Sequence, residues 1–367
     1  MNKARVIAFY LPQYHPIPEN DKYWGKGFTE WTNVAKAKPL FRGHYQPHIP
    51  ADLGFYDLRL PEVREAQAEL ARDAGIEGFC YHYWFANRKM LLQKPFEEVL
   101  RLGKPDFPFC LCWANHDWTT KTWVKGSSMV NNTMIAQQEY LGEQDDIKHF
   151  EYCLRAFKDH RYITIEGKPI FLIYDPLSFP NVKEFMNRWN FLAKKNNLKG
   201  IYFIGVTTGR QSSYKIVTNL GFDGVCHNRR WEAEAKAAGF RFVRRMHSLL
   251  GWHLGISLMK YDYNKVVRNY DTPENKLENC YPVITPGFDR TPRAGRRAGI
   301  YVNSSPKNFK KHVAEVCKSI QDKDDDHRLV FLSAWNEWGE GNYMEPDLKW
   351  GHGYLEALKS VVKFQIK

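Results

Sequence analysis

The sequence lacks the features that mark several common classes of protein. Its 367 residues include seven Cys, an odd number without regular spacing, which argues against a disulfide framework. No apolar run reaches the roughly 18 residues that a membrane-spanning helix requires, and Met1 leads into the first apolar segment without a signal peptide. From these absences we expect a reduced, cytoplasmic protein with no transmembrane segment.

Motifs for nucleotides and nucleic acids are missing as well. There is no G-x-G-x-x-G and no P-loop. The net charge of +12 would suit an acidic partner, but Lys and Arg are spread along the chain and no RNA- or DNA-binding motif accompanies them. The His and Asp residues are scattered and form no recognisable set of metal ligands. We therefore expect no nucleic-acid partner, no metal and no cofactor.

Aromatic residues, in contrast, are abundant. Phe, Trp and Tyr make up 15% of the chain, with 12 Trp and 20 Tyr. Flat rings stack on the apolar face of a pyranose, while the polar tips of Tyr and Trp still form hydrogen bonds. The composition therefore suits a sugar-binding cleft, and an aromatic-rich core is the alternative.

Eight short apolar runs separated by helical patterns predict a (β/α)8 barrel. The predicted strands are 5–11, 78–85, 107–113, 168–174, 201–206, 222–226, 280–286 and 329–334. The predicted helices are 61–74, 95–102, 145–159, 182–196, 213–220 and 305–321. The stretch 230–279 has a mixed pattern and no strand of its own. We expect residues 1–367 to form a single TIM-type α/β domain with long loops after its strands.

Polar and aromatic residues follow nearly every predicted strand. A barrel brings the carboxyl ends of all its strands to one mouth, whereas an open sheet brings together only those at its switch point. We therefore expect these side chains to meet and to bind substrate, with ordinary core packing as the alternative for the histidines and rings. The candidates are Tyr14, His15, Trp31, His82, Trp84, Asn115, His116, Trp118, Tyr174, Asp175, His227, Asp289, Arg290, Arg293, Trp335, Asn336 and Trp338.

Two carboxylates directly after the eighth strand are the candidate catalytic pair. Glu337 and Glu340 lie three residues apart, flanked by Trp335 and Trp338. Cleavage of a sugar bond needs one acid that donates a proton and one that stays ionised. The spacing alone is typical of a solvated loop, and the position at the mouth of a barrel is what favours catalysis.

Other charged residues leave alternatives open. Asp289 either binds a sugar diol or caps a turn. Arg290 and Arg293 are placed to meet an anionic group, such as a uronate, a phosphate or the pyrophosphate of a nucleotide sugar. Glu30, between Phe28 and Trp31, is a candidate third carboxylate.

Several long segments resemble the WbsX-like family, the glycoside hydrolase family 99-like proteins of bacterial O-antigen and capsule gene clusters. These segments are 9–16, 27–34, 78–84, 286–293 and 335–341, and the resemblance covers essentially the whole chain. More distantly, the chain is similar to the family 99 endo-α-mannosidases. Those enzymes are (β/α)8 barrels with Asn-Glu-Trp-x-Glu-Gly at the eighth strand, which residues 336–341 match.

The resemblance implies a retaining reaction on a glycosidic bond of a bacterial surface polysaccharide or its precursor, anionic or lipid-linked. Glu337 would remove the proton of the sugar's 2-hydroxyl, so that O2 attacks C1 and forms a 1,2-anhydro sugar. Glu340 would protonate the leaving oxygen and then deprotonate water. As the acid it needs a raised pKa, which burial against Trp335 and Trp338 would supply. WbsX-like proteins are also labelled glycosyltransferases, so one alternative is a transferase of O-antigen, capsule or lipopolysaccharide assembly. The other is a non-catalytic glycan-binding barrel.

Overall fold

Eight parallel strands close into a barrel. The structure is a computed structural model that describes residues 4–86, 89–120, 133–209, 211–238, 246, 249 and 259–362. Around the barrel the strands run β1–β2–β4–β8–β9–β10–β12–β14, and β14 pairs with β1. Their bounds are β1 Arg5–Tyr10, β2 Gly78–Ala86, β4 Phe109–Trp113, β8 Lys168–Ile173, β9 Tyr202–Val206, β10 Gly224–His227, β12 Cys280–Ile284 and β14 Leu329–Leu332. The (β/α)8 fold predicted from the sequence is confirmed, and each predicted strand coincides with one of these.

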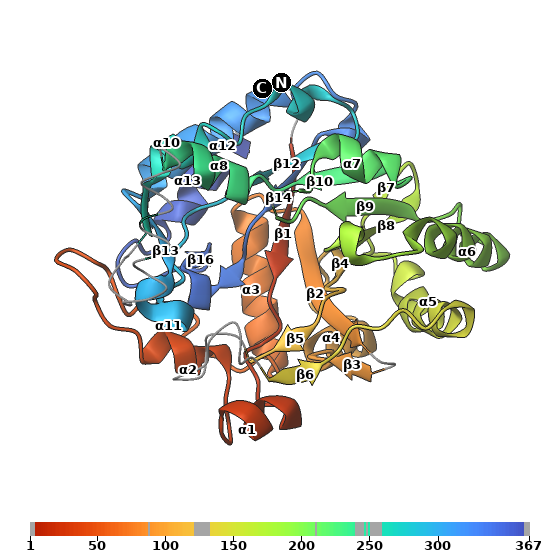
Figure 1. The fold of residues 1–367 in the computed structure, drawn as a ribbon, viewed down its shortest axis with the longest axis horizontal. Helices are drawn as coiled ribbons and strands as arrows, with labels where there is room; N and C mark the ends of the chain where they lie inside the picture. Colours follow the sequence, from red (N-terminus) through yellow and green to blue (C-terminus); the bar gives the residue numbers. More distant parts are fainter. Residues whose placement is uncertain are drawn as a thin grey trace.

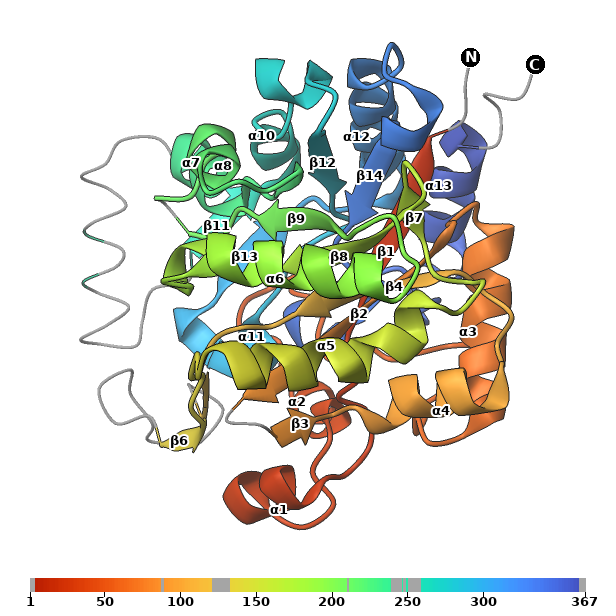
Figure 2. The ribbon, with the colours of Figure 1, turned by 90° about the vertical axis from the view of Figure 1, so that its right-hand side faces the viewer.

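The predicted helices also form, and they surround the barrel (Figures 1 and 2). Their bounds are α3 Pro61–Asp73, α4 Lys94–Leu102, α5 Glu143–Phe157, α6 Val182–Lys195, α7 Tyr214–Asn219 and α12 Pro306–Ser319, followed by α13 Gly353–Val362. The start of α12 follows from its sequence, because the Ser305 side chain accepts a hydrogen bond from Asn308 N and Pro306 takes the first helical position. No helix in the part of the chain that the structure describes combines the length and the apolar character needed to cross a bilayer.

Short elements gather at the carboxyl ends of the strands. The arrowheads of β1 and β2 point toward the end of the molecule where α2 and α11 lie, in the lower part of Figure 1. The elements there include α1 Pro18–Trp24, α2 Glu30–Ala35, α11 Thr291–Ala294 and the 3-10 turn η6 Trp338–Glu340. Here α2 and α11 both pack against η6. Segments far apart in the sequence therefore meet beside the two candidate catalytic glutamates.

The prediction that 230–279 contains no strand is wrong. The stretch contains α8 Arg230–Ala237, β11 Met259–Asp262 and α10 Tyr263–Val267, while residues 239–245, 247–248 and 250–258 lie outside the described residues. Strand β11 pairs in parallel with β13 Gly299–Val302, outside the barrel. Only Tyr261 of its four residues is buried, so the apolar run that marks a barrel strand is absent.

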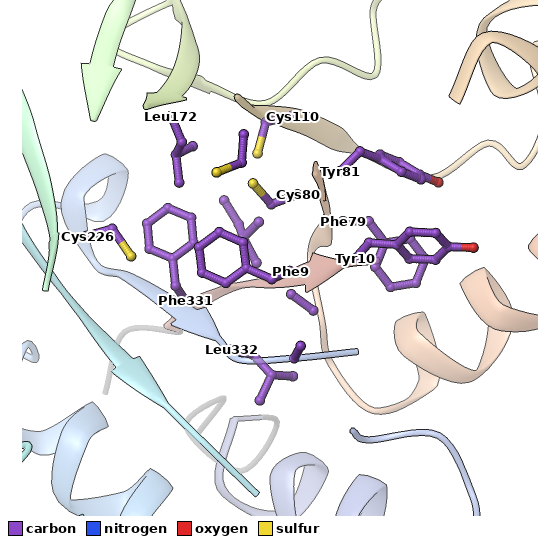
Figure 3. Close-up of a cluster of buried hydrophobic side chains, with 14 of the residues drawn as sticks. Phe9, Tyr10, Phe79, Cys80, Tyr81, Cys110, Leu172, Cys226, Phe331 and Leu332 are labelled. Carbon is purple, nitrogen blue, oxygen red and sulfur yellow. The ribbon is translucent and has the colours of Figure 1, made fainter. Parts of the chain in front are cut away.

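The barrel interior is packed with aromatic rings and thiols. Phe9 of β1 stacks on Phe331 of β14, with ring centroids 5.4 Å apart. Figure 3 shows Cys80, Cys110 and Cys226 around these rings, while Tyr10, Phe79 and Tyr81 extend to the other side of the strands. All seven cysteines are buried and free, so they serve as small apolar side chains. The barrel interior is therefore a packed core and not a pore.

Candidate active site

Two cavities meet at the mouth of the barrel. One, of about 150 Å³, is lined by Trp84, His116 and Trp118 and is called the aromatic lobe. The other, of about 110 Å³, is lined by Asn228, Arg230 and Trp231 and is called the basic lobe. Both are also lined by His82, Tyr174, Glu337 and Glu340. The two glutamates therefore stand at the junction of one continuous cleft.

Arg293 joins three glutamates beside this junction. Its Nη2 lies 2.9 Å from Glu337 Oε2, and its Nη1 lies 2.8 Å from Glu340 Oε1. Its Nε donates a hydrogen bond of 2.8 Å to Glu30 Oε1. The Arg293 side chain is 7% exposed, whereas those of Glu337 and Glu340 are 19% and 20% exposed. Arg293 lines the aromatic lobe, but its guanidinium nitrogens bind protein carboxylates. It therefore orients Glu337 and Glu340 and is not available to an anionic substrate group.

Glu30 reaches this cluster because η6 contains a glycine. The Glu30 side chain is fully buried at the start of α2. A Cβ placed on Gly339 would lie 1.9 Å from Glu30 Oε1, so only glycine allows this approach. Glu30 is thus the third carboxylate that the sequence suggested, and its partner is Arg293.

Glu340 is held in its ionised form. Burial alone would raise its pKa, but the guanidinium groups of Arg293, Arg290 and Arg230 outweigh burial and lower the pKa of Glu340 to about 2. Arg290 Nε and Arg230 Nη1 lie 3.5 and 3.9 Å from the carboxylate oxygens. The expectation that burial raises the pKa of Glu340 therefore fails, because three cations surround the carboxylate.

The environment of Glu337 raises its pKa, whereas that of Glu340 lowers it. Burial raises its pKa, the Arg293 guanidinium opposes that rise, and the neighbouring charges of Glu340 and Glu30 add to it. With one nearby guanidinium instead of three, Glu337 binds a proton more readily than Glu340 does. The two carboxyls thus have well-separated proton affinities, as pairs that share acid–base work usually do.

The aromatic lobe provides flat surfaces of the kind that bind sugar rings. Trp84 and Trp118 stack with centroids 5.8 Å apart, and His116 packs edge-on against Trp84. His82 stacks on Phe9 at 5.1 Å, which sets its ring at the floor of the mouth. The predictions that His82, Trp84, His116, Trp118 and Tyr174 meet at one site agree with this arrangement.

Five other candidates lie beneath the cleft and do not line it. Trp335, Trp338, Asn336 and Tyr14 have no exposed surface, and Trp31 is 8% exposed. Asn336 bridges to the backbone of β1's end, with Oδ1 accepting from Leu11 N and Nδ2 donating to Leu11 O. The Tyr14 hydroxyl donates to Asn336 O and accepts from Trp338 N. These residues therefore support the segment that contains Glu337 and Glu340 from beneath and do not line the cleft.

Five more candidates do not line the cleft, namely Asn115, Asp175, His15, His227 and Asp289. Asn115 ties two strand ends together, since its Oδ1 accepts from Asp175 N and its Nδ2 donates to Asp175 O. His15 and His227 are 1% and 6% exposed, and neither lines the cleft. Asp289 accepts hydrogen bonds from Thr291 N and from the side chains His44 and Gln46. Of the two alternatives for Asp289, turn capping is the one observed.

Two residues that contact the candidate site were absent from the sequence-based set. Arg230 follows β10 and lines the basic lobe, where its guanidinium stacks on Trp231 and Phe288. Glu345 is buried under the catalytic segment and accepts hydrogen bonds from the side chains of Trp338, Tyr56 and Gln67. The Asn228-Arg229-Arg230 run after the sixth predicted strand was a signal for the first, whereas an isolated Glu gave none for the second.

No group of His, Cys, Asp and Glu side chains among the described residues is arranged to hold a metal ion. His44 and His48 are four residues apart, a spacing that suits a metal on a helix. Here they lie in a loop and have different partners: His44 bonds Asp289, and His48 bonds Tyr343.

Solved structures of similar fold support this architecture. A glycoside hydrolase-like protein superposes with a TM-score of 0.60 at 16% identity, covering 99% of this chain and 94% of that chain. The GH99 endo-alpha-mannosidase from Bacteroides thetaiotaomicron superposes with a TM-score of 0.58 at 15% identity, covering 99% and 98%. At these identities the likeness concerns the fold alone.

Sequence relatives identify the family. The chain is 34% identical over 361 residues to the uncharacterized protein WxcX of Xanthomonas campestris pv. campestris, strain B100, and equally to that of a second strain. The match covers 98% of this chain and 50% of each relative, so the chain spans about half the length of the curated relatives it matches. The family model described as Glycosyltransferase WbsX matches residues 6–358. The chain therefore belongs to the WbsX family.

Proposed function

We propose that this chain is a carbohydrate-active enzyme that acts on glycosidic bonds through Glu337 and Glu340. The observation that carries the proposal is their position: both carboxylates line both lobes of one cleft at the barrel mouth, and Arg293 holds both. The substrate class is a bacterial surface polysaccharide or its precursor, as the family resemblance implies.

The reaction is a retaining one in which the substrate's own hydroxyl assists. Glu337 takes the proton of the 2-hydroxyl, O2 bonds to C1, and the bond from C1 to the leaving oxygen breaks as Glu340 gives that oxygen a proton. Water or an acceptor hydroxyl then opens the 1,2-anhydro ring, with Glu340 taking its proton and O2 regaining one from Glu337. Each carboxyl returns to its starting state, as acid–base catalysis requires.

In this reaction Glu340 must be protonated before it can act as the acid. Its three neighbouring arginines oppose this, because they favour the ionised carboxylate. A substrate with an anionic group in the basic lobe would relieve the opposition, because a uronate or phosphate competes with Glu340 for Arg230, which lines that lobe. Binding an acidic sugar would thus raise the pKa of the acid that cleaves it.

Anion binding in the basic lobe is tested with simple glycosides. Methyl glucuronide should raise the melting temperature of the protein more than methyl glucoside does, and Arg230→Met should abolish the difference. Equal shifts from both glycosides in the wild-type protein would remove the support for an acidic substrate.

A glycosyltransferase of surface-polysaccharide assembly is the second candidate, because the family model itself is described as a glycosyltransferase. The retaining reaction proposed above and a glycosyltransferase reaction differ in whether an activated sugar donor is needed. Purified protein should cleave or rearrange oligosaccharide fragments of its source's surface glycan without an added nucleotide sugar. Turnover only when a nucleotide sugar is supplied would favour the transferase, and binding without any turnover would favour a non-catalytic barrel.

A further inference from the structure

Another cavity lies beside the cleft that the aromatic and basic lobes form, and outside it. It has a volume of about 320 Å³, within the range of small-molecule sites. We call it the side cavity. Its lining includes the partly exposed rings of Phe41, Tyr45, Trp350 and Tyr354 and the buried carboxylates of Asp289 and Asp347.

The side cavity is separated from the cleft by a layer of backbone that includes Glu340. Asp289 N donates a hydrogen bond of 2.6 Å to Glu340 O, and a Cβ placed on Gly341 would lie 2.8 Å from Asp289 Cβ. Phe288 and Tyr301 line both the side cavity and the basic lobe. A ligand in the side cavity would therefore lie one backbone thickness from Glu340.

The charged groups around the side cavity already have partners within the protein. Asp347 Oδ1 accepts from Lys349 N and Trp350 N, and its Oδ2 accepts from the Tyr343 hydroxyl. The Lys349 ammonium lies 4.6 Å from the ring centroid of Tyr45 and 4.9 Å from that of Trp350. The second carboxylate, Asp289, is likewise bonded on both oxygens. With its carboxylates bonded and its ammonium held between two rings, the cavity favours an uncharged ligand.

The shape and chemistry of the lining suit a pyranose. Aromatic faces at the opening can stack on the apolar face of a sugar, and carboxylate oxygens accept bonds from its hydroxyls. Asp289 Oδ1 accepts a hydrogen bond from Thr291 N, and a carboxylate oxygen can accept a second one. Ser304 Oγ, which also lines the cavity, makes only a long bond of 3.4 Å to Tyr301 O.

We infer that the side cavity is a second carbohydrate-binding site that takes a neutral pyranose unit against the rings of Tyr45 and Trp350. This goes beyond the proposed reaction, since it concerns binding at a place the catalytic residues do not reach. Asp347 is its positioning residue, because its carboxylate fixes the backbone of Lys349 and Trp350.

Ligand-observed saturation-transfer NMR tests the inference. The probes are the methyl pyranosides of glucose, mannose, galactose and rhamnose, together with uridine diphosphate as a ligand that could also stack on the rings. At least one pyranoside should bind the wild-type protein. Trp350→Ala and Tyr45→Ala should each weaken that binding about tenfold, because each removes one stacking face.

A matched variant serves as the control. Phe191→Ala removes an exposed ring on α6, away from the lining of the side cavity. This variant should leave the binding unchanged. The inference is overturned if no pyranoside binds, if only uridine diphosphate binds, or if Trp350→Ala and Tyr45→Ala both bind as the wild type does. Because the readout is binding, the outcome does not depend on whether the cleft catalyses the proposed reaction.

Discussion

The carboxylate of Glu30 occupies the space that a side chain on Gly339 would need. A Cβ there would lie 1.9 Å from Glu30 Oε1 and 2.8 Å from Arg293 Nε. The two residues are 309 positions apart in the chain, yet their contact lets α2 supply a third carboxylate to the arginine that holds the catalytic pair.

Gly339→Ala should therefore disrupt the site. The added methyl group must displace a buried carboxylate, which should lower the free energy of unfolding by about 3 kcal/mol and remove most of the activity. The matched control is Gly299→Ala, where a Cβ would meet Tyr261 at an ordinary 3.5 Å. Urea denaturation of both variants measures the effect, and equal stabilities would contradict the close approach.

Arg293→Met should leave the buried carboxylate of Glu30 and the partly buried carboxylates of Glu337 and Glu340 without their common cation. Removing one partner of a buried ion pair destabilises by about 4 kcal/mol, and misplacing the glutamates should lower kcat/KM about 100-fold or more. Arg296→Met, at an exposed position three residues on, should behave like the wild type. A variant at Arg293 that keeps full activity would mean that the cluster does not orient the pair.

Arg290→Met should raise the pKa of Glu340 from about 2 by roughly one unit, because it removes one of three nearby cations. Carbon-13 NMR of protein labelled at the Glu carboxyl measures this, with the signal assigned by its loss in Glu340→Gln. A titration midpoint that does not move would show that Arg290 is not an electrostatic partner of Glu340.

Glu345 should make stability depend on pH. Burial raises its pKa from 4.5 to about 7, against the three hydrogen bonds that it accepts. The folded state thus binds more protons than the unfolded state between these values, so this contribution is complete below pH 4.5 and is lost as pH rises toward 7. The shift corresponds to about 3 kcal/mol. Glu345→Gln should flatten the dependence over this window relative to the wild type, whereas an unchanged profile would exclude Glu345 as its source.

The barrel could be predicted from sequence because each of its strands is a nearly continuous buried run, as in Leu329–Leu332, where all four residues are buried. Met259–Asp262 could not, since a strand with one buried residue gives no such signal. The position of Glu337 and Glu340 at the barrel mouth was predicted from their place after the eighth strand, and their catalytic role stays a prediction.

The surroundings of the pair were harder to predict. Trp335 and Trp338 adjoin Glu337 in sequence but point into the core, and sequence adjacency does not reveal on which side of the backbone a ring lies. The pairing of Glu30 with Arg293 spans 263 positions and has no local pattern. The burial of the site and the charges around it both depend on residues that are distant in sequence. The direction of the pKa shift of Glu340 was therefore predicted wrongly.

The most direct test of the central claim is turnover of the source's own surface glycan by Glu337→Gln and Glu340→Gln, measured beside binding of the same glycan. Each substitution keeps the size of the side chain and removes its acid–base chemistry. Both variants should bind the glycan with affinity close to that of the wild type and lose nearly all turnover. Turnover that survives in both variants would contradict the assignment of Glu337 and Glu340 as the catalytic pair.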